Sequence, residues 1–589
     1  MLVECSAASR SREGPIQRKH RRDGNGLGGQ GMRYGVALSG GGHRATVWTL
    51  GGLLALVDAG LNPNVVSVSS VSGGSIANGA VAHGGDYQTM TGPSFVKHTQ
   101  PAMRLATIDG LFFHGPLTDG YVRQVFATTA AAVAGLVALV AALVTAGRGV
   151  HIGWSVGVGL APALVGSFVL SRRQWRQKLR GDLRVSIVGG LVATLPMTLV
   201  AVGWTTSVDG FAIPLVVAFL AATLLLLVRH AVATFGKRSQ KVVDALATSL
   251  FTGDDGKPTL LADVAQHVHH VFCATELQSG DHVYLTPKLI TSYRAGKGQP
   301  NDLTLADAVQ ASACLPGGFV ARELDTADFD MTRPWPVEDN QPSDVPPILV
   351  VNDGGVYDNM ADQWEQGFNR RLQRNPDLSD IQDAADTLVV INAGKALGWQ
   401  PFKRARGINA EVRGLTRSLD ILYDVSTSHR RQGLVARFKS HGPDRMDGAL
   451  VHIAQTPFDI PEAFKGRTNP ETGRRTDEAE RAKTALDLLE ELGMDEKTWT
   501  HRASRNSQVK TGLRPLGQSV TADLLEHAYL LATINLFVIL GSTPLPTTDD
   551  GTFDLTPFAR QRFDDIARAD PPHDAMSISA PNLRRDVLN

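Results

Sequence analysis

The stretch Tyr34–Arg44, YGVALSGGGHR, joins a short apolar strand to a glycine-rich turn, and residues 65–75, VVSVSSVSGGS, repeat this order. After the first turn, apolar residues recur with helical spacing from Val47 to Val57, and the pattern stops at Gly60. A second helix, rich in small residues, is expected after Ser72. Strand, glycine turn and helix, twice in succession, is the order typical of an α/β fold with a parallel sheet.

The composition excludes several classes of function. Among 589 residues, Lys and Arg together number 58 and Asp and Glu together number 58, so the net charge does not indicate a nucleic-acid partner. The cysteines Cys5, Cys273 and Cys314 are spaced neither like a disulfide framework nor like a zinc site. We therefore predict no metal and no cofactor, and the sequence gives no indication of a protein partner.

Residues 1–32 are predicted to form a disordered basic arm. They contain six Lys and Arg residues between positions 10 and 22, then a glycine-rich run, and they lack the apolar core of a secretory signal. A solvated tail is the favoured interpretation, and attraction to anionic lipid headgroups is the functional alternative.

Four apolar segments interrupt the α/β pattern, at about residues 126–146, 152–170, 185–204 and 211–228. None contains Lys, Arg, Asp or Glu, and a helix of about 20 residues crosses the hydrocarbon core of a bilayer. Four such segments in succession are difficult to bury in a water-soluble protein of this length. We predict a transmembrane insertion of four helices over residues 121–235.

The charge of the connecting loops predicts the orientation of this insertion. The loop between the second and third segments and the residues after the fourth are basic, whereas the other two loops hold only Arg148 and Asp209. Basic loops stay on the cytoplasmic side. We expect a multi-pass integral membrane protein in which residues 33–120 and 236–400 form one cytoplasmic domain. The basic residues are Arg172, Arg173, Arg176, Lys178, Arg180, Arg184, Arg229, Lys237, Arg238 and Lys241.

After about residue 240 the pattern of a water-soluble fold returns. A strand followed by a turn is expected over residues 272–280, further strands over 347–351 and 387–392, and a helix over 303–313. Residues 401–570 are expected to complete the domain with helices, among them 478–492 and 521–540. Three polar residues, Asp523, Glu526 and His527, make the latter a surface-to-core helix instead of a fifth span. Residues 571–589 are expected to be a mobile tail.

Ser72 is the candidate nucleophile. It follows a valine-rich strand and precedes Gly73 and Gly74, whose small size lets a strand turn sharply into a helix and present the hydroxyl. Ser70 stands where a nucleophile elbow usually has its first glycine. An N-cap role for Ser72 is the structural alternative, and Ser69, Ser70 and Ser75 remain other choices of serine.

Gly40, Gly41 and Gly42 form the candidate oxyanion hole. Backbone N–H groups between a strand and a helix can bind an anion, and the helix N-terminus adds partial positive charge. A tight structural turn is the alternative. A Walker-type phosphate loop is disfavoured because no Gly-Lys-Ser/Thr follows, and the G-x-G-x-x-G spacing of dinucleotide sites is missing.

Asp353 is the candidate base. It ends an apolar strand and is followed by Gly354 and Gly355, and active sites gather at such strand ends in parallel α/β sheets. A carboxylate there can accept the serine proton. An Asx turn that closes the strand is the structural alternative.

Together these segments resemble the patatin-like phospholipase family. Ser39–Arg44 is similar to its glycine-rich oxyanion loop, Ser72–Gly74 to its serine elbow and Asp353–Gly355 to its Asp-Gly-Gly motif. Ala274–Gly280 and Ala311–Pro316 are similar to segments that lie between serine and aspartate in the family. The resemblance covers about residues 33–95 and 240–360, in the family's order. The transmembrane insertion and the region after about residue 400 depart from a minimal member.

The resemblance implies a three-layer α/β sandwich with a mainly parallel central sheet, in a bacterial membrane-inserted member. It implies a Ser72–Asp353 dyad, with oxyanion donors from Gly41 and Gly42, and with Arg44 either fixing the loop or meeting a substrate phosphate. His43 and His429 stay open as further participants. The expected function is hydrolysis of membrane lipid esters. The alternatives are acyl transfer to an alcohol by the same dyad and a catalytically inactive lipid-binding scaffold.

Overall fold

The computed structural model describes residues 32–111, 238–264, 267–335, 344–394, 397–399, 408–440, 446–469 and 471–541. The four predicted membrane segments, the predicted tail and the basic arm up to residue 31 lie outside these residues.

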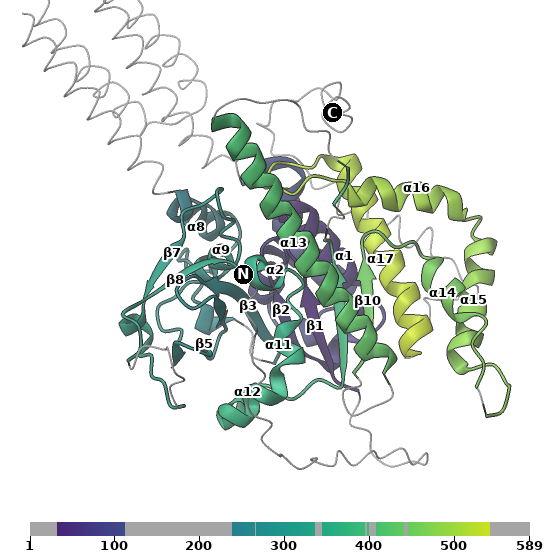
Figure 1. Ribbon diagram of the computed structural model, residues 1–589, viewed down its shortest axis with the longest axis horizontal. Coiled ribbons are helices and arrows are strands. Elements are labelled where there is room, and N and C mark those ends of the chain that lie inside the picture. The colour runs from purple at the N-terminus through teal and green to yellow at the C-terminus, as the bar shows by residue number, and fades with distance from the viewer. Residues whose placement is uncertain are drawn as a thin grey trace, which may run out of the picture. The chain divides into compact units, whose positions relative to one another are not determined.

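A ten-stranded mixed sheet forms the centre of the described α/β fold (Figure 1). Its five parallel strands lie in the order β10 (Asp447–His452), β9 (Thr387–Asn392), β1 (Tyr34–Leu38), β2 (Val65–Ser70) and β3 (His269–Glu276). The strands β4 (Asp281–Leu285), β5 (Ile290–Ser292) and β6 (Gly296–Gly298) continue it in antiparallel fashion.

The expectation of a mainly parallel sheet is therefore right for one half of the sheet and wrong for the other. Only Leu277–Gly280 separate β3 from β4, and such a short connection allows a hairpin but not the crossover that parallel strands need. The parallel half contains β1 and β2, which lead into the two glycine-rich turns.

Two strands lie off the main path of the sheet. β8 (Ile348–Asp353) pairs with β3, and β7 (Arg322–Asp325) pairs with β8, both in antiparallel fashion. The end of β8 carries Asp353.

Helices cover both faces of the sheet because its strands carry apolar side chains on both sides. Val36 and Leu38 of β1 belong to one buried cluster, and Ala37 between them belongs to a second one. The first cluster includes residues of α1 (Gly42–Asp58), α2 (Gly73–His83), α3 (Gly92–Arg104) and α17 (Gln518–Leu540). The second includes residues of α11 (Gln363–Gln366), α12 (Phe368–Arg374) and α13 (Ile408–Lys439).

Most of the remaining helices also contribute residues to the first cluster. The remaining helices are α8 (Arg238–Ser249), α9 (Leu305–Ser312), α10 (Gly355–Asp358), α14 (Asp459–Phe464), α15 (Asp477–Glu491) and α16 (Glu496–Ser507).

Among the described residues, α17 is the one helix whose length and composition would let it cross a membrane. Within its most apolar stretch of 18 residues, 72% is buried inside the protein. It packs along α1, where Gly51 lets the two backbones approach closely, since a Cβ there would lie 2.8 Å from the carbonyl oxygen of Leu525. This burial agrees with the expectation that residues 521–540 form a core helix.

The close packing of α1 on α17 predicts an unusual response to a helix-favouring substitution. Gly51→Ala should lower the melting temperature of the purified full-length chain, because the new methyl group overlaps the backbone of α17 at a cost of about 1–3 kcal/mol. The matched control is Gly433→Ala on α13, where a Cβ meets nothing within 4 Å and should stabilise the helix by up to about 1 kcal/mol. Equal melting shifts for the two variants would contradict this packing.

Candidate active site

The ends of β2 and β8 meet on one side of β3. β4 pairs with β3 through Phe272–Glu276, so β2, which pairs through His269–Phe272, must lie on the opposite side. β8 pairs through Ala274–Glu276 and therefore takes that same side, directly beyond the end of β2. Asp353 is paired with Ala274, at the level that Ser72 reaches two residues after β2 ends. Two segments separated by some 280 positions thus end at one point.

Ser72 has the strained backbone of a nucleophile elbow. Its φ of 54° and ψ of −120° lie in a region that residues other than glycine rarely adopt. The turn is tight on both sides, because a Cβ at Gly73 would lie 2.0 Å from the Gly42 carbonyl oxygen and one at Gly74 would lie 2.7 Å from that of Leu38. Side chains at these positions would break the contact between elbow and glycine loop.

The structure also distinguishes Ser72 from the neighbouring serines. Ser69, Ser70 and Ser75 are fully buried, whereas Ser72 is partly exposed. The Ser70 hydroxyl donates to the Val271 carbonyl and accepts from Ser75, which accounts for a serine at the usual glycine position. Among these four hydroxyl groups, that of Ser72 is the one open to a substrate.

Asp353 is a buried carboxyl group beside Ser72. Its side chain is 2% exposed, and Oδ1 accepts the N–H of Gly355 at 2.8 Å. Oδ2 is buried and has no hydrogen-bond partner among the described residues. Burial raises the pKa of Asp353 from 3.8 to about 6, while the Gly355 N–H and the Ser72 side chain act in the opposite direction. The carboxylate is thereby a better base than an exposed aspartate.

The Asp-Gly-Gly motif is needed for close packing around this carboxyl group. A Cβ at Gly354 would lie 2.2 Å from the Cys273 carbonyl oxygen, and one at Gly355 would lie 3.0 Å from Oδ1 of Asp353. The two glycines let the chain turn from β8 into α10 while the carboxyl group stays buried.

The glycine loop lies against Ser72 but offers fewer donors than expected. A Cβ at Gly40 would lie 3.2 Å from the Ser72 Cβ, yet the Gly40 N–H donates to the Asn359 carbonyl at 3.0 Å. Gly40 is therefore not an available oxyanion donor, which corrects its sequence-based assignment. Within the described residues, the N–H groups of Gly41 and Gly42 have no acceptor. Their positive φ angles of 141° and 61° keep glycine at both positions.

Arg44 and His43 do not face the Ser72 hydroxyl. Arg44 is 1% exposed and its guanidinium donates to the Val509 carbonyl, and burial lowers its pKa to about 10. His43 is buried against the Arg514 carbonyl at 3.0 Å, and burial lowers its pKa to about 4. Both side chains hold the 509–514 segment on the glycine loop, so Arg44 supports the loop instead of meeting a substrate phosphate. His429 is exposed on α13.

Ser312, at the end of α9, connects the two halves of the site. Its carbonyl accepts the N–H of Ser72 at 3.1 Å and that of Gly354 at 3.2 Å. Its hydroxyl donates to the Cys273 carbonyl at 2.6 Å. Sequence reasoning noted the segment Ala311–Pro316 but did not assign this role, because a backbone acceptor leaves no signature in the residue type.

Both ends of the chain around residues 112–237 lie beside the site. The N–H of Leu111 donates to the Leu513 carbonyl, next to Gly512, whose carbonyl accepts from His43 at the glycine loop. On the other side, Ser239 and Cys314 both bond to the Val320 carbonyl, and Cys314 in turn accepts the N–H of Asp353. The chain therefore leaves the described fold near the glycine loop and re-enters it near Asp353.

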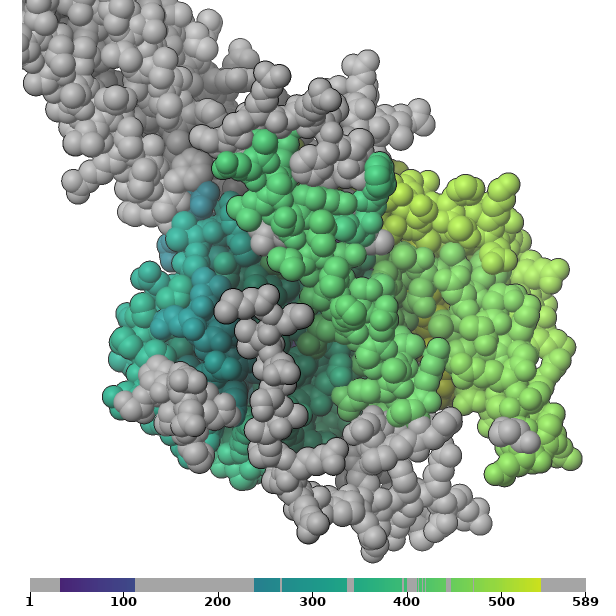
Figure 2. All heavy atoms as spheres, viewed as in Figure 1, coloured from purple at the N-terminus to yellow at the C-terminus, as the bar shows by residue number. Residues whose placement is uncertain are grey.

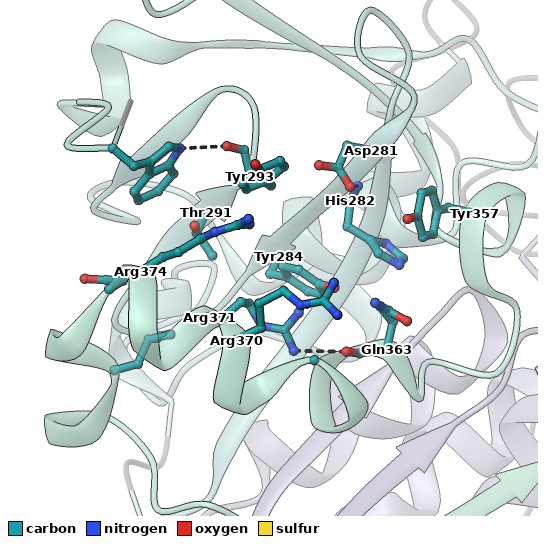
Figure 3. A pocket seen from close by; sticks show the side chains of 14 residues that line it. Asp281, His282, Tyr284, Thr291, Tyr293, Tyr357, Gln363, Arg370, Arg371 and Arg374 are labelled. Atoms are coloured by element: carbon teal, nitrogen blue, oxygen red, sulfur yellow. Dashed lines mark hydrogen bonds between the residues drawn. The ribbon is translucent and has the colours of Figure 1, made fainter. Parts of the chain in front are cut away.

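A separate hollow of about 220 Å³ lies beyond α10 (Figure 3). Tyr357, four residues after Asp353, lines it, but neither Ser72 nor Asp353 does. The Arg371 guanidinium in it already donates to the backbone carbonyls of Gln363 and Trp364. This hollow is therefore not the candidate active site. Its charged and aromatic lining includes Asp281, His282, Tyr284, Arg370, Arg371 and Arg374.

Within the described residues, no three His, Cys, Asp or Glu side chains are grouped as metal ligands would be.

Comparisons with known proteins do not assign the chain to a family. No protein-family model matches it, and no curated protein sequence matches it. Among solved structures, the crystal structure of VipD from Legionella pneumophila is similar at 12% sequence identity over 92% of each chain, with a TM-score of 0.21. A TM-score this low supports no inference about fold or function.

The raised pKa of Asp353 predicts a stability effect that depends on pH. The folded state binds a proton more tightly than the unfolded state, so the carboxyl group lowers stability as pH rises from about 4 to about 6, and by a constant amount above that. Asp353→Asn should therefore raise the free energy of unfolding at pH 8, by roughly 3 kcal/mol at most, and leave it nearly unchanged at pH 4. Thermal unfolding of the purified chain at both pH values measures this, and destabilisation at pH 8 would contradict the burial of a charge.

Proposed function

We propose that this chain is a membrane-anchored serine lipid acyl hydrolase of the patatin-like type. The observation that carries the proposal is the meeting of β2 and β8 on one side of β3, which puts a strained, accessible serine beside a buried carboxyl group with a raised pKa. The glycine loop next to them has two N–H groups without acceptors. These are the three components of acyl-ester hydrolysis by a dyad.

In the proposed reaction, Asp353 accepts the hydroxyl proton of Ser72 as Oγ attacks the ester carbonyl carbon. Gly41 and Gly42 N–H groups stabilise the oxyanion, and Asp353 returns the proton to the departing alcohol. A water molecule then gives a proton to Asp353 as it attacks the acyl-serine. Asp353 returns this proton to Ser72 Oγ as the bond to the acyl carbon breaks, which releases the fatty acid and restores both side chains. The Ser72 hydroxyl is near enough to Asp353 to lower its pKa, although it makes no hydrogen bond of ordinary length to Oδ2. Catalytic contacts of this kind often tighten only when substrate binds.

Anchoring by the four apolar segments is part of the proposal. The described residues that flank them, Leu111 and Ser239, lie near the glycine loop and near the Asp353 segment, so a bilayer crossed by these segments would be close to Ser72. A lipid then needs to leave the bilayer only in part, which avoids exposing most of its acyl chain at about 0.8 kcal/mol per CH₂. The basic loops favour a catalytic domain on the cytoplasmic side.

Covalent labelling tests the assignment of the nucleophile. A fluorophosphonate probe should label the full-length protein on Ser72, and Ser72→Ala should abolish both the labelling and fatty-acid release from phospholipid. Ser504→Ala, on the exposed side of α16, is the matched control and should behave as wild type.

Labelling of another serine, or unchanged activity of Ser72→Ala, would refute the proposed dyad. Folded wild-type protein that is not labelled would favour the inactive scaffold. Addition of an alcohol acceptor separates hydrolysis from acyl transfer, because only transfer yields a new ester.

A further inference from the structure

The first half of α13 presents large apolar side chains to solvent. Leu415 is 64% exposed and Leu422 is 65% exposed, and Ile421 and Val425 are also exposed. Trp399, shortly before the helix, is 95% exposed, and the Gly398 carbonyl beside it accepts from Arg417 of α13. We name Leu415, Ile421, Leu422 and Val425 the α13 ridge. Figure 2 shows α13 as a green band across the visible face of the protein.

The ridge occupies the outer side of the helix. At 100° per residue, its four members fall within a sector of about 120°, and the inner side carries Tyr423, Thr427 and Leu434. Thr427 and Leu434 are buried against the domain. The helix therefore carries apolar residues on both sides, although exposed Ser418 and His429 also lie in the outer sector, and only the inner side has a partner among the described residues.

The inner side of α13 contacts the segment that begins at Asp353. The Tyr423 hydroxyl is buried without a hydrogen-bond partner in the described part of the chain, and the pKa of Tyr423 is raised by burial and then by the charge of Asp353. Two turns further on, the Arg430 guanidinium forms ion pairs with Asp358 at 3.0 Å and Asp362 at 2.6 Å, shortly after the Asp-Gly-Gly motif. A change in the position of α13 would therefore change the surroundings of the Asp353 side chain.

The surroundings of the ridge indicate what covers it. The chain leaves the described domain at Leu111 and returns at Arg238, and both points adjoin the site that Tyr423 faces. Figure 1 shows α8, which begins at Arg238, to the left of the upper half of α13. The sequence between these points contains the four apolar stretches. An exposed apolar ridge at this end of the domain, with a tryptophan beside it, has the chemistry of an interfacial anchor.

We propose that the α13 ridge and Trp399 insert into the lipid bilayer and hold the mouth of the Ser72–Asp353 site on its surface. This inference rests on the proposed lipid hydrolase function and adds the element that docks on the substrate surface. Contact with lipid on the outer side of α13 is transmitted through Tyr423 and Arg430 to the Asp353 loop.

Lipid contact can be measured at single positions of the full-length chain in phosphatidylcholine–phosphatidylglycerol vesicles. Starting from Cys5→Ser, with Cys273 and Cys314 buried, an environment-sensitive fluorophore is attached to Leu422→Cys or to Asp420→Cys. Asp420 is exposed two residues away, about 200° around the helix, and is the matched control. Brominated acyl chains should quench the fluorophore at 422 and not at 420. No quenching at 422, or equal quenching at both positions, would overturn the proposal, and a fluorophore at 422 shielded from water without quenching would indicate a protein partner instead.

An activity ratio separates failure of this inference from failure of the proposed function. The double variant Leu415→Ser, Leu422→Ser should lose about tenfold in hydrolysis of vesicle phospholipid relative to a water-soluble short-chain ester. Asp420→Ser should keep the wild-type ratio. An unchanged ratio in the double variant would overturn docking by the ridge, while fluorophosphonate labelling of Ser72 reports the proposed function independently.

Discussion

The geometry of the candidate active site depends on one structural constraint, the sharing of a single side of β3 by β2 and β8. Because β2 stops at Ser70, the backbone of β3 from Ala274 onward is free to pair with β8, which arrives from the opposite direction. The two strand ends meet there, and the Ser312 carbonyl binds an N–H from each. Hydrogen bonds of the sheet, and not the connecting chain, thus hold Ser72 beside Asp353. The fold tolerates the long segment between residues 111 and 238 because the residues that flank it both lie near the candidate site.

Two features of the candidate site lower the stability of the folded state. Ser72 adopts a φ of 54°, and Asp353 carries its charge in a buried position. Strain at a single non-glycine residue costs about 1–3 kcal/mol, and it persists only where the surroundings determine it. Here the surroundings are backbone contacts made by Gly42, Gly73 and Gly354, at which an added Cβ would lie 2.0–2.3 Å from a carbonyl oxygen. The glycines therefore allow the packing that holds the strained elbow.

Much of the fold could be predicted from local patterns. The strand Thr387–Asn392 has the predicted bounds, and the strand Tyr34–Leu38 begins at the predicted residue and ends before the glycine-rich turn, because each is a short apolar run bordered by turn residues. The antiparallel half of the sheet could not be predicted from periodicity, since alternation does not reveal the direction of a neighbouring strand. Helix α13 has apolar residues on both sides, so its pattern could not tell the packed side from the exposed one.

The candidate site was predictable to the level of motifs. Ser72 and Asp353 stand out in the sequence because a nucleophilic serine needs small residues after it at the turn, and a catalytic carboxylate is expected at the end of a strand. The sequence could not show which glycine N–H groups are free to bind an oxyanion, those of Gly41 and Gly42 but not that of Gly40. It also could not show that the Ser312 carbonyl accepts two N–H groups, because any residue can make such backbone hydrogen bonds.

The contact between Ser72 and Asp353 is tested most directly by the pKa of Asp353. Infrared difference spectroscopy, with the signal assigned by Asp353→Asn, measures this pKa in wild type and in Ser72→Ala. If the two side chains are in contact, the pKa is about 6 in wild type and rises further in Ser72→Ala, because the hydroxyl no longer lowers it. An identical pKa in both proteins would contradict the contact between Ser72 and Asp353.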